Sequence, residues 1–354
     1  MSEIEGMQAL RLQMPRKVPR TEYSAHCHWE LVNKVTGSKI SLQSSIKEKN
    51  AASSAFVKAW DYSYFWNITI NSWRGIFGNH YTRMGHAEYA TGGSDFDNRI
   101  YCPFNSPEEV LDFHADEFYS VKPHKELVEL FNSDLKQKQE LFPDCVNSAG
   151  IYTTVMSGLI EIFGWDMLLM AAGTDSEKFG EVVNHYARFI KPYFDALADS
   201  DSEVVMVHDD IVWTSGAFLH PDFYRKYIFA NYKKLFAPLK ESKKIILFTS
   251  DGNYTQFIDD IAGCGVNGFV MEPMTDMKYI AEKYGKTHSF IGNADTRVLL
   301  SGGKEDIENE VKRCLEIGKN CPGFIMAVGN HIPSNTPVEN ALWYNEIYEK
   351  LSRR

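Results

Sequence analysis

The chain has 354 residues, of which 44% are hydrophobic and 24% are charged, a composition typical of a globular protein with a large core. Its 47 acidic residues outnumber its 37 lysines and arginines, and the sequence has no basic run, so we expect no nucleic-acid partner. No apolar run approaches the ~20 residues of a membrane span, and the N-terminus lacks the apolar stretch of a signal peptide. These features predict a cytoplasmic protein with no membrane partner.

The N-terminal half contains three candidate strands, which are unevenly spaced. Residues 18–26 and 62–70 have the composition of strands, and residues 151–163 are typical of a strand running into a helix. Residues 73–150 do not follow this pattern. We expect them to form an insertion, like a lid, within a single domain that covers residues 1–354.

The C-terminal half alternates regularly between short apolar runs and helical patterns. The runs are 203–207, 244–248, 265–271, 288–292 and 323–328. Short continuous apolar runs are typical of parallel strands buried on both faces, and their alternation with helices indicates an α/β fold. With the three earlier strands, the pattern predicts a single (β/α)8 TIM barrel. A doubly wound open sheet is the alternative. The sequence has no glycine-rich nucleotide motif, so we expect no nucleotide cofactor.

Polar side chains follow almost every predicted strand. The groups are His26 to His28, His208-Asp209-Asp210, Thr249-Ser250-Asp251, Glu272, Asn293 with Asp295, and Asn330-His331. In a (β/α)8 barrel the carboxyl ends of all strands lie on one face, where catalytic groups gather. Each group alone is equally consistent with a turn or a helix cap, but histidine and glutamate are not typical cap residues.

Histidine and carboxylate side chains at one edge allow two kinds of chemistry. Three of them with one open position can bind a divalent metal ion such as zinc. Alternatively, a desolvated carboxyl can act as an acid or base without a metal. The spacing of the residues leaves both options open.

Four stretches carry a resemblance to a known family. They are VVMVHDDIVWTSGAFLHPDFYRKYIF, FTSDGNYTQFIDDIAGCGVNGFVMEP, IGNADTRVLLSGG and AVGNHIPSNTPVEN. Together they resemble the uroporphyrinogen decarboxylase superfamily, which also includes corrinoid-dependent methyltransferases. The resemblance covers about residues 15–350 of the sequence. It implies a single (β/α)8 barrel whose site lies at the carboxyl ends of the strands.

Neither well-known branch of this superfamily is matched in full. Arg16 and Arg20 have the spacing of the decarboxylase arginine signature, but the surrounding motif is missing. The histidine and cysteine ligands of the zinc methyltransferases fall on Thr249, Asp251 and Asn330. Any metal site would therefore use oxygen and imidazole ligands.

The resemblance and the strand-end residues together favour a methyltransferase that moves a methyl group from a small methylated substrate to a corrinoid protein. The expected catalytic residues are Asp251, Glu272, His208 and Asp209. The expected substrate-binding residues are His28, Asn293, Asp295 and Asn330, and a zinc ion would use Asp251, Glu272 and His331. The alternatives are decarboxylation of uroporphyrinogen or another carboxylated compound, and a barrel that binds a ligand without catalysis. A homodimer is compatible with the sequence.

Overall fold

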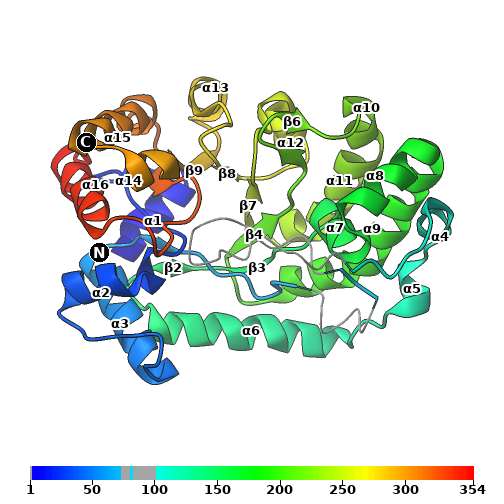
Figure 1. Cartoon of the computed structure of the whole chain (residues 1–354), viewed down its shortest axis with the longest axis horizontal. Helices are drawn as coiled ribbons and strands as arrows, with labels where there is room; N and C mark the ends of the chain where they lie inside the picture. The colour runs from blue at the N-terminus through cyan, green and yellow to red at the C-terminus, as the bar shows by residue number, and fades with distance from the viewer. Residues whose placement is uncertain (1, 73–79, 83–100) are drawn as a thin grey trace.

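Six parallel strands form the main sheet, in the order β10-β9-β8-β7-β4-β3. This computed structural model describes residues 2–72, 80–82 and 101–354. The strands are β3 (Ala149–Ile151), β4 (Val204–His208), β7 (Ile245–Ser250), β8 (Gly268–Met271), β9 (Ser289–Ala294) and β10 (Phe324–Val328). Five of them confirm the apolar runs predicted in the C-terminal half. The sixth, β3, ends where the predicted strand of 151–163 begins and shares only Ile151 with it. Figure 1 shows them in the middle of the molecule, surrounded by helices.

Two chain segments extend this sheet through short contacts. The backbone N–H of Thr21 donates to Met326 O of β10 at 3.0 Å, and the N–H of Ser63 donates to Arg20 O at 2.8 Å. Next to Ser63, β1 (Tyr64–Phe65) pairs in parallel with β2 (Val146–Asn147). These are short bridges and not continuous ladders, so the described residues form a largely parallel α/β sheet without a closed barrel. The predicted strand 18–26 does not form: it is reduced to a single bridge between Arg20 and Met326, and Ala25–Cys27 form a 3-10 turn.

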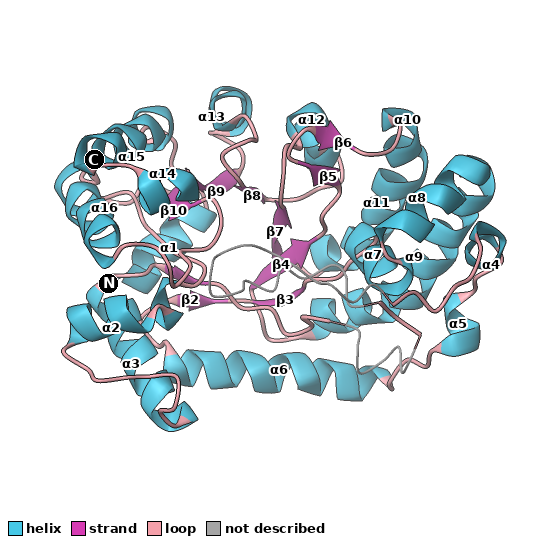
Figure 2. Cartoon of the chain, in the orientation of Figure 1, coloured by secondary structure: helices cyan, strands magenta, loops and turns pink. Residues whose placement is uncertain are grey.

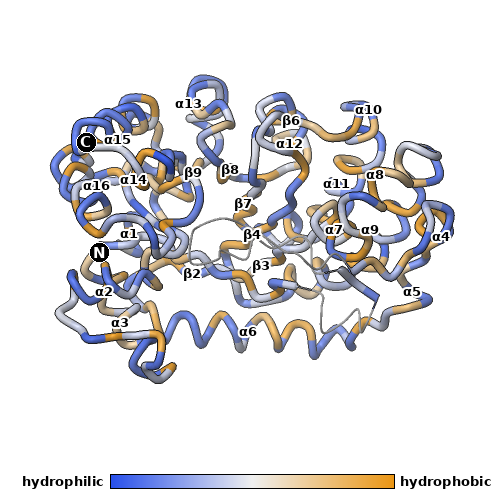
Figure 3. The backbone as a smooth tube through the Cα atoms, in the orientation of Figure 1, coloured by the Kyte–Doolittle hydropathy of each residue, from blue (hydrophilic) through white to orange (hydrophobic). Residues whose placement is uncertain are grey.

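The strands are buried because helices cover the sheet. Every residue of β4, β8, β9 and β10 is buried, as expected of parallel strands that are covered on both sides. Figure 3 shows hydrophobic residues along β4 and β7, whereas α6 alternates between hydrophobic and hydrophilic residues. The register aligns the strand ends, since His208 lies beside Thr249 and Asn293 beside Ala327.

Helices make up most of the remaining structure, as Figure 2 shows. In the first half they are α1 (Ser2–Leu10), α2 (Trp29–Thr36), α3 (Ile46–Ala59), α4 (Pro107–Leu111), α5 (Ala115–Phe118), α6 (His124–Leu141), α7 (Met156–Phe163), α8 (Trp165–Thr174) and α9 (Ser176–Asp199). In the second half they are α10 (Pro221–Phe223), a π-helical turn (Tyr224–Ile228), α11 (Phe229–Glu241), a 3-10 turn (Thr255–Phe257), α12 (Ile258–Ala262), α13 (Met277–Tyr284), α14 (Thr296–Ser301), α15 (Lys304–Gly318) and α16 (Val338–Leu351). A hairpin of β5 (Val212–Trp213) and β6 (Gly216–Ala217) follows β4.

The predicted insertion, residues 73–150, is shorter at its C-terminal end than expected. Residues 73–79 and 83–100 lie outside the described part, and the rest forms α4, α5 and α6 before the chain enters β2 and β3. Residues 146–150 already belong to strands. They are mostly small, and at Gly150 the strands approach so closely that a Cβ would lie 2.5 Å from Met206 O. A strand of such residues lacks the continuous apolar run by which the other strands were predicted from the sequence.

Within the described ranges, no single helix has the length and apolar composition of a membrane span. Helices α7 and α8 have the length and apolar composition of a span only when they are counted as one segment, and the chain bends by 106° between them.

The turn after β7 depends on Gly252. Its φ is +80°, and a Cβ there would lie 2.7 Å from the carbonyl carbon and oxygen of Trp213 in the β5–β6 hairpin. We predict that Gly252→Ala lowers the free energy of unfolding by about 3 kcal/mol, because left-handed strain and a backbone clash add. Urea-induced unfolding measures this change.

Gly37 is the matched control for this variant. Its φ of +72° is similar, but a Cβ there meets nothing within 4 Å. Gly37→Ala should therefore lose only about 1 kcal/mol. Equal losses in the two variants would show that the contact with the hairpin does not matter.

Candidate active site

Three side chains from the ends of β4 and β7 meet at one edge of the sheet. His208 ends β4, Asp210 follows it, and Asp251 follows β7; their nitrogen and oxygen ligand atoms all lie within 4.8 Å of one another. His208 Nε2 is 2.8 Å from Asp210 Oδ1, and the backbone N–H of Asp251 donates to the same oxygen at 3.0 Å. The ring of Tyr152 lies over the His208 imidazole, with their centroids 3.9 Å apart. We call these three residues the acidic triad.

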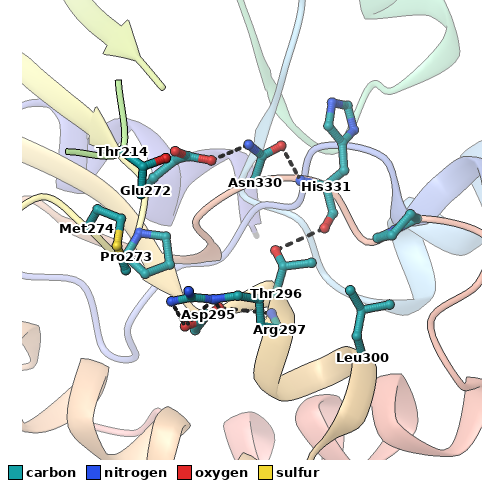
Figure 4. A pocket seen from close by; sticks show the side chains of 11 residues that line it. Thr214, Glu272, Pro273, Met274, Asp295, Thr296, Arg297, Leu300, Asn330 and His331 are labelled. Carbon is teal, nitrogen blue, oxygen red and sulfur yellow. Dashed lines mark hydrogen bonds and ion pairs between the residues drawn. The ribbon is translucent and has the colours of Figure 1, made fainter. Parts of the chain in front are cut away.

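Glu272 and Asn330 extend the acidic triad toward the ends of β8 and β10. Glu272 accepts a hydrogen bond from the backbone N–H of Gly252 at 2.6 Å and another from the Asn330 side-chain amide. The Asn330 oxygen in turn accepts from the backbone N–H of His331 at 2.7 Å. Figure 4 shows the chain of contacts from Glu272 through Asn330 to His331. Four strands therefore contribute to one polar cluster.

The close carboxylates change how the cluster holds protons. Burial, the Asp210 carboxylate and, more weakly, Glu272 raise the pKa of Asp251 to about 8, although His208 and a hydrogen bond from Asn330 oppose the shift. Burial alone would lower the pKa of His208, but Asp210 beside it raises the pKa above its ordinary value. This raised pKa favours the protonated form of Asp251 at neutral pH, and in that form the carboxyl can act as an acid.

A cavity of about 250 Å³ opens beside Glu272. It is lined by Thr214, Glu272, Pro273, Met274, Asp295, Thr296, Arg297, Leu300, Asn330, His331 and Pro333. Arg297, which lines the cavity, forms an ion pair with Asp295 at 2.6 Å. The positive charge of its guanidinium is therefore balanced by the Asp295 carboxylate. In Figure 4 the His331 ring points away from Thr296 and Leu300. The cavity has the size for a small molecule and for little more.

Asp209, a predicted catalytic residue, points away from the acidic triad. Its buried carboxylate accepts the backbone N–H groups of Val155, Met156 and Ser157 at 2.6 to 3.1 Å and a hydrogen bond from the Tyr232 hydroxyl. It therefore holds the N-terminus of α7, where a negative charge is favourable. This placement makes Asp209 a structural anchor next to the site.

The four predicted substrate-binding residues have different surroundings. Asn330 belongs to the cluster, and Asp295 lines the cavity while it caps α14. His28 is buried, caps α2, and has Nε2 2.8 Å from Thr336 O. Asn293 is buried behind Glu272 and donates to the Glu272 backbone oxygen at 3.2 Å. The structure thus does not bring His28 to the site and places Asn293 as a support.

The predicted metal ligands are also regrouped. Of Asp251, Glu272 and His331, only Asp251 belongs to the acidic triad, and His331 packs its ring against Tyr23 at 5.5 Å. Asp210, which the sequence analysis missed, takes the central place. A signal existed, because side chains two residues apart on a strand point the same way. His208 and Asp210 share one side for this reason, and Asp209 lies on the other.

The arginine pair that resembles the decarboxylase signature does not lie in the cavity. Arg20 is fully buried, pairs with Glu22 at 3.0 Å and lies against the rings of Trp60 and Tyr348 at 4.5 and 4.6 Å. Arg16 is exposed. Arg20 is therefore committed to the core, where removal of a buried ion-pair partner is costly.

Asp209 and Asp210 form a natural pair for mutagenesis. We predict that Asp209→Ala lowers the free energy of unfolding by about 3 kcal/mol, because four buried donors lose their acceptor. Asp210→Ala should cost about 1 kcal/mol or less, since Asp210 is partly exposed. Urea-induced unfolding of both variants measures the difference, and a larger loss in Asp210→Ala would contradict the assignment of Asp209 as the anchor.

Comparisons with known proteins agree with the resemblance in the sequence. The family model for uroporphyrinogen decarboxylase (URO-D) matches residues 94–350. The uroporphyrinogen decarboxylase of Carboxydothermus hydrogenoformans is 28% identical over 176 residues, which cover 50% of this chain and 47% of that protein. That of Geobacter sulfurreducens is 26% identical over 162 residues, 46% of each chain. The chain thus spans about half the length of the curated relatives it matches.

A solved structure is similar over almost the whole chain. It is a methyltransferase from Methanosarcina mazei, with a TM-score of 0.66 and 16% identity, and the match covers 99% of this chain and 98% of that one. At this identity the likeness shows a shared fold. Because the family model matches most of the chain, the protein belongs to the uroporphyrinogen decarboxylase family.

Proposed function

We propose that this protein is a methyltransferase of the uroporphyrinogen decarboxylase family that moves a methyl group from a small methylated compound to a corrinoid protein. The observation that carries the proposal is the acidic triad next to Glu272, a residue that lines a small cavity. Burial and the neighbouring carboxylates raise the pKa of Asp251 to about 8, which favours its protonated form at neutral pH. A methyl group bound to oxygen or nitrogen leaves that atom more easily when the atom receives a proton.

The proposed step is balanced without an oxidant. The reduced corrinoid cobalt supplies the electron pair for the new cobalt–methyl bond, and the old methyl–oxygen or methyl–nitrogen bond breaks with its pair on the leaving atom. Asp251 gives its proton to that atom as the bond breaks, and the resulting negative charge on Asp251 is stabilised by the neighbouring His208. Solvent returns the proton to Asp251 for the next turnover.

Four observations support methyl transfer over decarboxylation of a porphyrinogen. The cavity of about 250 Å³ suits a small molecule, whereas a tetrapyrrole is much larger. Glu272, which lines the cavity, and the nearby Asp210 would repel the carboxylates of that substrate. Arg20, which has the spacing of a carboxylate-binding arginine, is buried in the core. The solved structure similar over the whole chain is also a methyltransferase.

Decarboxylation remains the second candidate, because the matched curated relatives are uroporphyrinogen decarboxylases. A protonated carboxyl such as Asp251 could protonate the carbon that loses carbon dioxide. A barrel that binds a ligand without turnover is the third candidate, and the experiment below separates all three.

Zinc is a cofactor that the acidic triad fits. One imidazole and two carboxylates have ligand atoms within 4.8 Å of one another, and His208 Nδ1 has no hydrogen-bond partner among the described residues. His208, Asp210 and Asp251 would hold the ion, in place of the set Asp251, Glu272 and His331. A bound zinc ion would displace the proton from Asp251 and act in its place, as a Lewis acid on the leaving atom.

We further propose that the sheet belongs to a (β/α)8 barrel. Residues 19–21 bond to β10, and the Ser63 N–H donates to Arg20 O, so these segments lie where the first two barrel strands would be. Such a barrel would bring all strand ends to one face. A cytoplasmic location is part of the same proposal.

An anaerobic methyl-transfer assay tests the function. Small O-methyl and N-methyl compounds serve as donors and chemically reduced free cobalamin as the acceptor. We predict turnover by the wild type and a loss of about 100- to 1,000-fold in kcat/KM for Asp251→Asn, because the acid is removed. His124→Ala, at an exposed site paired with Asp199, is the matched control and should keep full activity.

Uroporphyrinogen is assayed in parallel for release of carbon dioxide. Release at the rate of the best methyl donor or faster would contradict methyl transfer and establish the decarboxylase. Tight ligand binding that survives Asp251→Asn and Glu272→Gln, with no turnover of any compound, would establish the binding barrel instead.

A further inference from the structure

A second cluster of possible metal ligands lies away from the candidate active site. His114, just before α5, and Asp116, within it, face His185 of α9, and their ligand atoms all lie within 4.8 Å of one another. None of these residues takes part in the function proposed above. Two imidazoles and a carboxylate are a common ligand set for zinc and related metals.

The spacing of the two imidazoles already matches a metal site. His114 Nδ1 and His185 Nδ1 are 3.2 Å apart. In a tetrahedral zinc site with bonds of 2.0–2.1 Å, two ligand nitrogens lie about 3.3 Å apart. Asp116 is exposed, so its carboxylate can adjust to complete a three-ligand site without disturbing the core.

The backbone of both histidines is held by the core. Phe113 and Ala115, on either side of His114, are buried, and Phe113 stacks on Phe118 with ring centroids 5.4 Å apart. Tyr186, next to His185, is also buried. The two rings therefore face each other because of packing, which lowers the entropy cost of binding an ion.

The charges around the cluster suit a cation, with one exception. Asp116 and Glu181 are negative and favour it, whereas the exposed Arg188, one turn after His185, opposes it. Burial, Arg188 and His114 lower the pKa of His185.

We propose that His114, Asp116 and His185 form a binding site for a zinc-like transition-metal ion that fastens the segment 105–119 to α9. The ion would replace the present contact between the two ring nitrogens, which on its own is a single hydrogen bond. This site is independent of the acidic triad and of the proposed methyl transfer.

Calorimetric titration of the metal-free full chain with Zn²⁺ tests the site, with Mg²⁺ as the comparison ion. We predict that His185→Gln lowers the zinc stoichiometry by one equivalent or weakens that binding step about 100-fold, and that Asp116→Asn weakens it about tenfold. Arg188→Gln should tighten it. In the wild type, zinc at about 100 times its Kd should raise the melting temperature by about 3 °C.

His124→Gln is the matched control, since His124 is an exposed histidine outside the cluster, and it should bind zinc like the wild type. The acidic triad could also bind zinc, so His208→Ala is titrated as well. A zinc equivalent that is lost in this variant is assigned to the acidic triad and not to the site at His185. Identical titrations of the wild type and both His185→Gln and Asp116→Asn would overturn the proposal. So would an equal loss in His124→Gln. Because Asp116 is exposed, its variant keeps the test decisive even if a change at His185 disturbs folding.

Discussion

Parallel pairing of the strands is the constraint on which the rest of the site depends. Because β4, β7, β8, β9 and β10 run in the same direction and in register, the residues after each strand meet at one edge. Asp210, Asp251 and Glu272 are brought together in this way. Like charges at short distance in a partly buried place are unfavourable. The donors Gly252 N–H and Asn330 Nδ2 offset this cost at Glu272, and the raised pKa of Asp251 favours a neutral carboxyl there.

A second layer of residues keeps this arrangement in place. Asp209 fixes the start of α7, and Ser157 of that helix accepts the Asp210 N–H at its hydroxyl, 2.7 Å away. Asn293 donates to the backbone of Glu272, and Gly252 allows the turn after β7 to lie against the β5–β6 hairpin. These residues need not touch a substrate to matter. They set the distances that give Asp251 its proton affinity, and so link the packing of the sheet to the chemistry.

The sequence predicted the C-terminal strands well, because each is a continuous apolar run, and it located Asp251, Glu272, His208 and Asn330 at strand ends. The prediction from sequence failed where tertiary contacts determine whether a segment forms a strand or what role a residue has. Residues 146–150 pair as strands without an apolar run, since close packing there requires small side chains. The role of Asp209 depends on α7, a helix that is distant in sequence. His28 caps the helix that follows it directly, but its contact with Thr336 O is distant in sequence. Asp210 could have been predicted from the alternation of side chains along a strand.

Infrared difference spectroscopy of the wild type and Asp251→Asn most directly tests whether crowded carboxylates hold a proton on Asp251. The carboxylic C=O band of the metal-free protein is followed from about pH 5 to about pH 9. We predict a band that is absent in Asp251→Asn, persists at neutral pH and disappears with a midpoint of about 8. If no such band differs between the two proteins above about pH 6, Asp251 is ionised under working conditions and cannot supply the proton.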